Sequence, residues 1–189
     1  MASRIEIEDS YILEDGYNVY EKLKKNGFVF ESQIVEEDTY YTDKDEVFIK
    51  DRVCLRTRKT NEDMLELTYK PKTDDNTEKY GKREVNIELN VKDYDDIRFV
   101  ISQLGYIEYI SFKKFREVYS KNIDGIQYSV MIDKIEGVGE YIELELLADT
   151  EEEQERLKVK LDEFVAMFEC YKLKEKTLPY RDIVKNAKK

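Results

Sequence analysis

The sequence has 189 residues and contains no histidine. This absence excludes Ser-His-Asp and Cys-His nucleophilic sites, and it also excludes metal sites built on histidine. Only two cysteines are present, Cys54 and Cys170, and they have no partners from which a zinc site could be built. A bound metal would therefore depend on carboxylates, which favours hard cations such as magnesium, manganese or calcium.

Long apolar runs are also lacking. No stretch approaches the roughly 18 residues that a membrane-spanning helix needs, and charged residues follow directly after the N-terminus, unlike a signal peptide. The net charge of -11 argues against general nucleic-acid binding but leaves room for a small basic pocket. We expect a cytoplasmic monomer or homodimer with no membrane or nucleic-acid partner.

Alternating apolar and polar residues predict about eight strands. Helical spacing predicts three or four helices, over about 15–26, 93–104 and 150–171, with a short one after Pro179. The strands follow one another as hairpins, so the sheet should be antiparallel. The hydrophobic fraction of 41% is enough for a core, and we expect one domain over 1–189.

Charged side chains share one face of the predicted strands. Arg56 and Arg58 lie opposite Leu55, and Glu6 and Glu8 lie opposite the isoleucines of the first strand. Such a face usually points to solvent. The predicted helices, however, have apolar stripes that need cover, and only the apolar strand faces can provide it. We therefore expect an α+β fold: a closed eight-stranded antiparallel β-barrel, a polar tunnel with helices packed outside.

The charges on the inward face suit a particular ligand. Bases neutralise phosphate oxygens, and carboxylates hold a divalent cation that bridges them. A histidine-free cluster of both therefore indicates a highly charged anion bound together with a metal. The six bases are Arg56, Arg58, Lys70, Lys82, Lys114 and Arg116.

The order of short motifs resembles the CYTH superfamily, also called triphosphate tunnel metalloenzymes. This family includes class IV adenylate cyclases, thiamine triphosphatases and inorganic tripolyphosphatases, and the spacing from Asp38 to Arg58 is most similar to the first two. The resemblance covers nearly the whole chain. Its motifs are Glu6-Ile7-Glu8-Asp9-Ser10, Asp38-Thr39-Tyr40-Tyr41, Leu55-Arg56-Thr57-Arg58, Leu67-Thr68-Tyr69-Lys70, Lys82-Arg83-Glu84, Lys114-Phe115-Arg116, Asp133, Gly137-Val138-Gly139, Glu143-Leu144-Glu145 and Pro179-Tyr180-Arg181.

The resemblance implies a small-molecule triphosphate as substrate and Mg²⁺ or Mn²⁺ as cofactor. It implies that the six bases grip the triphosphate, and that Glu6, Glu8 and Glu84 serve the catalytic end. It also implies a metal site made of Glu6, Glu8, Asp133, Glu143 and Glu145.

The chain departs from the family pattern at two positions. Ser10 stands where the first motif has a lysine beside the reacting phosphate, and Lys176 and Arg4 are candidates to replace it. Asn86 stands where relatives often carry another acid. The sequence predicts a metal-dependent hydrolase of tripolyphosphate or a small organic triphosphate. A class IV adenylate cyclase and a non-catalytic triphosphate or polyphosphate binder are the alternatives.

Overall fold

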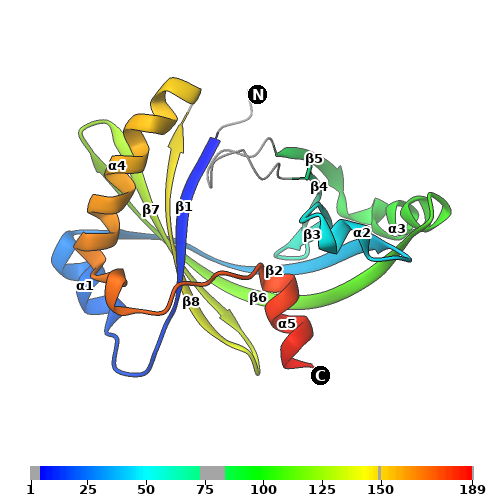
Figure 1. Ribbon diagram of the computed structural model, residues 1–189, viewed down its shortest axis with the longest axis horizontal. Helices are drawn as coiled ribbons and strands as arrows, with labels where there is room; N and C mark the ends of the chain where they lie inside the picture. Colours follow the sequence, from blue (N-terminus) through cyan, green and yellow to red (C-terminus); the bar gives the residue numbers. More distant parts are fainter. Residues whose placement is uncertain (1–4, 73–83, 149, 189) are drawn as a thin grey trace. The chain divides into compact units, whose positions relative to one another are not determined.

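The computed structural model describes residues 5–72, 84–148 and 150–188 (Figure 1). Runs of consecutive strands are separated by helices, as in an α+β fold. The strands are β1 (Ile5–Ile12), β2 (Val29–Asp43), β3 (Cys54–Thr60), β4 (Met64–Lys70), β5 (Val85–Asn90), β6 (Tyr106–Ile123), β7 (Ile126–Ile135) and β8 (Gly139–Ala148). The helices are α1 (Val19–Asn26), α2 (Val47–Lys50), α3 (Tyr94–Gln103), α4 (Glu151–Phe168) and α5 (Tyr180–Ala187).

The strands form an eight-stranded sheet in the order β1-β8-β7-β6-β2-β3-β4-β5. Hairpin neighbours such as β3 with β4 and β7 with β8 pair antiparallel, so the predicted antiparallel α+β fold is confirmed. The order ends at β1 and β5. The closed barrel that the sequence suggested is therefore not confirmed.

The chain divides into two compact units, and each contains part of the sheet. The described parts of 1–34 and 115–179 form the first unit, and the described parts of 35–78, 82–114 and 180–189 form the second. The long strands β2 and β6 have residues in both units. The single domain expected over 1–189 stays a prediction.

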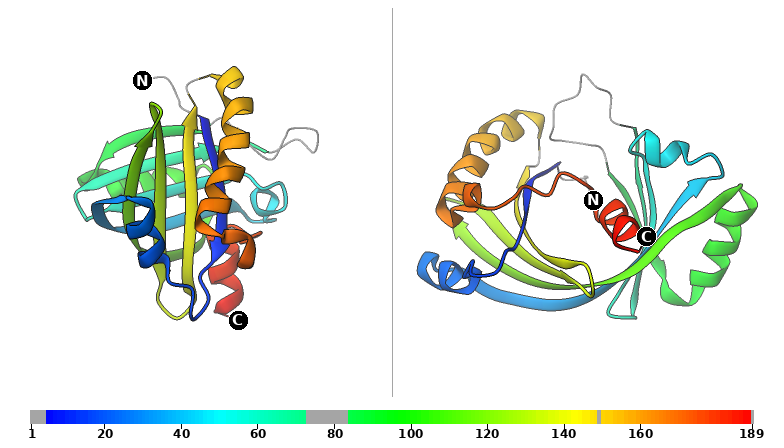
Figure 2. Two further views of the ribbon diagram at one scale, coloured as in Figure 1. Left: turned by 90° about the vertical axis from the view of Figure 1, so that its left-hand side faces the viewer. Right: turned by 60° about the horizontal axis from the view of Figure 1, so that its bottom comes forward.

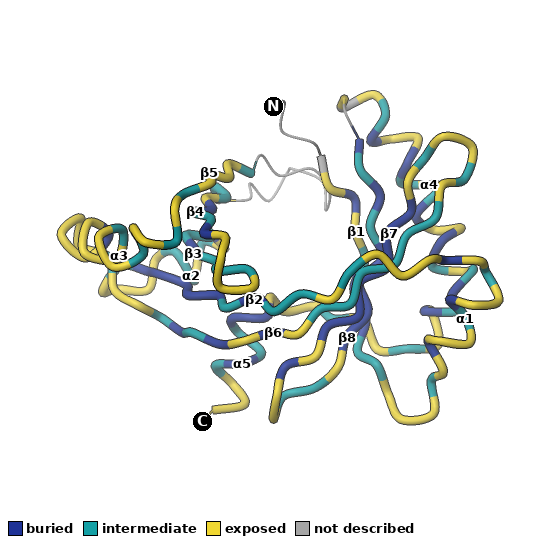
Figure 3. Tube along the Cα trace, turned by 180° about the vertical axis from the view of Figure 1, so that it is seen from behind, coloured by how far each residue is buried: buried dark blue, intermediate teal, exposed yellow. Residues whose placement is uncertain are grey.

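The core of the first unit lies between α4 and the apolar face of the strands. Figure 2 shows α4 running alongside β1 and β8. Its residues Leu157, Leu161, Phe164 and Phe168 are at most 2% exposed, as their helical spacing predicts. The strands contribute alternate residues to the same core, among them Leu144 and Leu146, so the opposite strand face is left for polar side chains. Figure 3 shows the buried residues that run along β7 and β8.

Local capping fixes the ends of the helices in this unit. The Thr150 hydroxyl accepts a hydrogen bond from the Glu153 amide, which begins α4 as predicted. Asn18 caps α1 in the same way, and Gly27 ends α1 in a left-handed conformation (φ 73°) that costs glycine little. The Tyr20 side chain of α1 faces outward: it is 54% exposed and donates a hydrogen bond to Glu117.

The second unit contains the β3–β4 hairpin, which turns at Asn61 and Glu62, both with positive φ. Helix α3 also exists, but its predicted apolar stripe is only partly buried. Ile101 is buried, whereas Val100 and Leu104 are 50% and 70% exposed. In the first turn of the helix the Tyr94 side chain contacts Thr39 of β2 and Lys59 of β3.

Helix α5 follows Pro179 as predicted and is anchored by a buried arginine. Arg181 is 3% exposed and donates a hydrogen bond to the Val53 carbonyl oxygen at 2.5 Å. Among the helices that the structure describes, none combines the length and apolar character needed to cross a membrane.

Candidate functional site

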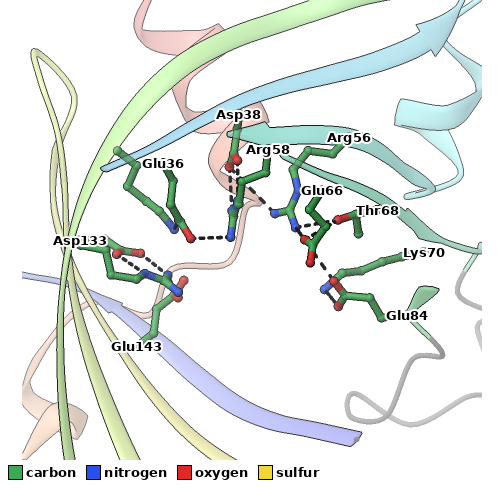
Figure 4. A network of polar contacts seen from close by, with 12 residues as sticks. Glu36, Asp38, Arg56, Arg58, Glu66, Thr68, Lys70, Glu84, Asp133 and Glu143 are labelled. Atoms are coloured by element: carbon green, nitrogen blue, oxygen red, sulfur yellow. Dashed lines mark hydrogen bonds and ion pairs between the residues drawn. The ribbon is translucent and has the colours of Figure 1, made fainter. Parts of the chain in front are cut away.

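Strands β2, β3 and β4 place charged side chains on one face of the second unit. Arg58 is paired with Asp38 on one side and with Glu66 on the other, and Arg56 is paired with Tyr40 and Thr68. Directly opposite residues in neighbouring strands share a face. The alternation of the Leu-Arg-x-Arg motif therefore brings both arginines to the same acidic surroundings, which Figure 4 shows from close by.

Arg58 is fixed by two carboxylates. Its Nε and Nη2 donate to the two oxygens of Asp38 at 2.6 and 2.8 Å, and its Nη1 donates to Glu36 at 2.8 Å. Burial raises the pKa of Asp38, but the charge and hydrogen bonds of Arg58, with Arg56 and Lys114 nearby, outweigh it and hold that pKa at about 2. The guanidinium plane is thus set before any ligand arrives.

Arg56 is less completely satisfied. It is 8% exposed and donates to the Thr68 hydroxyl at 3.0 Å, while Glu66 and Asp38 lie 3.7 and 3.9 Å away. Its Nε is buried and has no hydrogen-bond partner among the described residues. A buried N–H without a partner is costly, so this guanidinium keeps capacity to bind an anion.

Two lysines complete the charged face of this unit. Lys114 is 1% exposed, lies 2.9 Å from a Glu36 oxygen and points over the ring of Tyr180. Lys70 forms a close ion pair with Glu84, which is also 4.0 Å from Arg56. The remaining predicted base, Lys82, lies outside the described residues.

The first unit contains a second cluster, on the polar face of β6, β7 and β8. Arg116 pairs directly with Asp133 and donates to both of its oxygens at 2.6 Å. The same guanidinium also contacts Glu143 closely (Figure 4). Asp133 is fully buried, and its two bonds to Arg116 give it an orienting role for this arginine.

Glu6, Glu8 and Glu145 form the acidic end of this cluster. Glu8 lies directly opposite Glu145 across the β1–β8 pair, and Glu6 is the diagonal neighbour two residues away. Burial, followed by the charges of Glu6 and Glu8, raises the pKa of Glu145 to about 8. These three carboxyl groups therefore lie close enough to influence one another's ionisation.

This donor set suits a hard divalent cation, because carboxylate oxygens are the ligands that magnesium and manganese prefer. A cation near Glu145 would offset both the burial and the repulsion that raise the pKa of this residue. Within residues 5–72, 84–148 and 150–188, however, no three Asp, Glu or Cys side chains are already gathered into a metal cage. Glu6, Glu8, Glu143, Glu145 and Asp133 all fit the metal by their chemistry, and two of them, Asp133 and Glu143, also contact Arg116.

One residue of the charged face was not identified from the sequence. Glu36 is 4% exposed and contacts both Arg58 and Lys114, so it holds two of the predicted phosphate-binding bases. The signal for it was its position two residues before Asp38, which puts both on the same strand face. Lys176, named as a candidate to replace the missing lysine, lies 3.8 Å from Glu143, and Arg4 lies outside the described residues.

Together these features define a class of protein: an α+β protein whose antiparallel sheet has a partly buried face of paired bases and acids. The chain belongs to the CYTH family, because the model of the CYTH domain matches residues 4–177. The resemblance seen in the motifs is thereby confirmed.

One curated relative and two solved structures are similar to this chain. The chain is 35% identical over 142 residues to "Putative adenylate cyclase MJ0240" of Methanocaldococcus jannaschii, a match that covers 75% of this chain and 76% of that protein. The PH1819 protein of Pyrococcus horikoshii OT3 has a similar structure, with a TM-score of 0.75, 25% identity and coverage of 96% and 98% of the two chains. HpAC1 from Hippeastrum, a "putative adenylyl cyclase" with a dominant triphosphatase activity, shares the fold at a TM-score of 0.67 and 13% identity, with 97% and 96% covered.

Proposed function

We propose that this protein is a metal-dependent hydrolase of triphosphates, acting on tripolyphosphate or a small organic triphosphate. The observation that carries the proposal is the burial of Arg56 and Lys114 on the same strand face as Arg58. Burying cations such as Arg56 and Lys114 is costly unless they serve a charged ligand or are fully paired. Arg56 keeps a buried Nε without a partner in the described part of the chain, which supports the ligand.

The bases have distinct parts in binding. Arg58 and Arg116 are each fixed by a two-point contact with an aspartate, so they present oriented N–H groups to phosphate oxygens. Lys70 and Lys114 are point charges that neutralise the remaining oxygens. Fixed positive groups stabilise a phosphoryl group in transfer without reorganising during the reaction, and this is the main contribution that we assign to the chain.

The metal would be held by Glu6, Glu8, Glu143 and Glu145. When bound, Mg²⁺ or Mn²⁺ would supply charge neutralisation at the phosphoryl group and help to activate water.

Two further acids position the bases. Asp133 keeps Arg116 in place, and Glu84 lies between Lys70 and Arg56 and positions both. The closed tunnel expected from the sequence belongs to this proposal.

A class IV adenylate cyclase is the second candidate. It is favoured by the name of the Methanocaldococcus relative at 35% identity. In that reaction the ribose hydroxyl of ATP attacks the innermost phosphorus and pyrophosphate leaves. We prefer the hydrolase because its reaction needs only water as nucleophile, and because the Hippeastrum protein joins the name of a cyclase to a dominant triphosphatase activity on the same fold.

One experiment separates the candidates. The purified protein is incubated with tripolyphosphate, thiamine triphosphate and ATP, each with Mg²⁺ or Mn²⁺, and orthophosphate and cyclic AMP are measured. Orthophosphate release supports the hydrolase, and cyclic AMP supports the cyclase. Tight binding without turnover of any substrate would leave a non-catalytic binder, and absence of both binding and turnover would refute a triphosphate function.

A further inference from the structure

The segment after α4 returns to the first strand and pairs with its outer edge. The Ile12 amide donates to the Lys174 carbonyl oxygen at 2.8 Å, and the Lys176 amide donates to the Ser10 carbonyl oxygen at the same distance. Tyr11 and Glu175 form the antiparallel bridge between these two bonds. All of these residues belong to the first unit, so residues 174–176 are a short additional strand beside β1.

The register of this pairing places three residues in one row. Lys176 is opposite Ser10, and Ser10 is opposite Glu143 on β8. Directly opposite side chains in an antiparallel pair share a face, and this face is the polar one that contains Glu8 and Glu145. The segment 174–176 therefore places Lys176 at the charged cluster, although β1, with which this segment pairs, lies far away in the sequence.

The small side chain of Ser10 allows the lysine to cross this row. Ser10 is 8% exposed, and the Nζ of Lys176 reaches past it to within 3.8 Å of a Glu143 oxygen. The Lys176 side chain is 11% exposed, so its ammonium is largely withdrawn from water. A separation of 3.8 Å is longer than a hydrogen bond, so Glu143 attracts this ammonium without a tight bond between the two.

We propose that Lys176 is a further substrate-binding residue, which supplies from the C-terminal segment the positive charge that Ser10 cannot supply from β1. Its ammonium lies near one oxygen of Glu143 and the Arg116 guanidinium contacts the other, so the two cations share one carboxylate. A phosphate oxygen at this end of the cluster would meet both. The proposal rests on the proposed triphosphate function and names the residue that completes its binding site in this chain.

A purely structural role is the alternative. The ion pair with Glu143 could simply hold residues 174–176 against β1, and its loss would then lower stability without changing ligand binding. The two roles differ in a direct binding measurement. They also differ in whether moving the ammonium to β1 restores the affinity for the ligand. A ligand contact can be restored in this way, whereas a contact that holds residues 174–176 in place cannot.

The test measures binding of inorganic tripolyphosphate to the metal-free protein by calorimetry, with melting temperatures to confirm folding. K176M should weaken binding about 10- to 100-fold, the range expected for one charge-assisted contact. K174M is the matched control, since it removes the same charge from an exposed side chain two residues away and should bind within about twofold of wild type.

The swap variant S10K/K176M places the ammonium on β1 instead. It should return the affinity to within about threefold of wild type, because the two positions are opposite each other in the register. If the swap variant does not fold, K176R replaces it in the test. Its affinity should also lie within about threefold of wild type, because the variant keeps a positive charge on the original segment.

Two results would overturn the proposal: K176M binding as tightly as wild type, or a folded rescue variant binding as weakly as K176M. Both leave the triphosphate function standing, because wild type still binds tripolyphosphate in each case. Absence of any binding or turnover by wild type would instead refute the proposed function itself.

Discussion

Arg58 is locked to Asp38 by two parallel hydrogen bonds, from Nε at 2.6 Å and from Nη2 at 2.8 Å. Asp38 is 1% exposed, so this pair lies out of water. In such surroundings the ionised form of each residue is stabilised by the opposite charge of its partner. Removing one residue leaves the other as an uncompensated ion. Arg116 and Asp133 repeat the same geometry in the first unit.

The pair with Arg58 predicts how acid affects stability. The pKa of Asp38 is about 2 in the folded protein and 3.8 when unperturbed, so its ionised form stabilises the fold above about pH 4. That contribution, about 2 kcal/mol, is lost as the pH falls towards 2. Asp38→Asn should lower the free energy of unfolding by about 2–4 kcal/mol at pH 7 and by much less at pH 2.5, measured by urea denaturation. An equal loss at both pH values would contradict the prediction.

Glu145 predicts the opposite dependence on pH. Its folded pKa of about 8 lies above the ordinary value of 4.5, so the folded state without metal binds an extra proton between these values. The free energy of unfolding therefore falls by roughly a few kcal/mol as the pH rises from 4.5 to 8. Glu145→Gln should raise the melting temperature at pH 8 and change it little at pH 4. Mg²⁺ should stabilise wild type at pH 8 more than it stabilises this variant.

Arg56 predicts the effect of removing a buried base. Arg56→Gln should weaken tripolyphosphate binding at least about tenfold, because a charged contact to phosphate is lost. The exposed Arg98, which pairs with Glu108 at 3.2 Å on the surface of the same unit, provides the control Arg98→Gln. Calorimetry should show binding close to wild type for the control. Equal affinities for both variants would mean that the charged face of β2 to β4 does not bind the ligand.

The core beneath α4 predicts a large stability effect. Phe164 is fully buried and packs against Phe28, Phe168 and Tyr128 with ring centroids 4.9–5.7 Å apart. Phe164→Ala should cost about 3–5 kcal/mol through lost burial and the cavity left behind. Val159→Ala on the same helix is the control, because Val159 is 61% exposed, and its cost should stay below about 0.5 kcal/mol. Chemical denaturation measures both.

Sequence patterns predicted the elements and the faces of the strands better than the partners of individual side chains. Period-2 alternation put Arg56 and Arg58 on one face, and helical spacing found the buried stripe of α4, because both depend only on local geometry. The exposure of Leu104 could not be foreseen, since it depends on how α3 meets the sheet. The same applies to Lys176, which reaches Ser10 through a pairing between residues more than a hundred and fifty positions apart.

Glu36 shows a related limit. Three consecutive acids, Glu36, Glu37 and Asp38, look alike in the sequence, yet Glu36 and Asp38 hold the buried bases while Glu37 pairs with Lys59 and Lys113 near the surface. Strand alternation separates them only once the buried face is known.

The short pairing of residues 174–176 with β1 also protects a strand edge. β1 ends the sheet order, and exposed N–H and C=O groups at such an edge can recruit a strand from another molecule. Here the Ile12 amide and the Ser10 carbonyl are occupied by the chain's own return segment. A chain cut before residue 174 would expose both groups, so self-association through β1 should accompany the loss of Lys176.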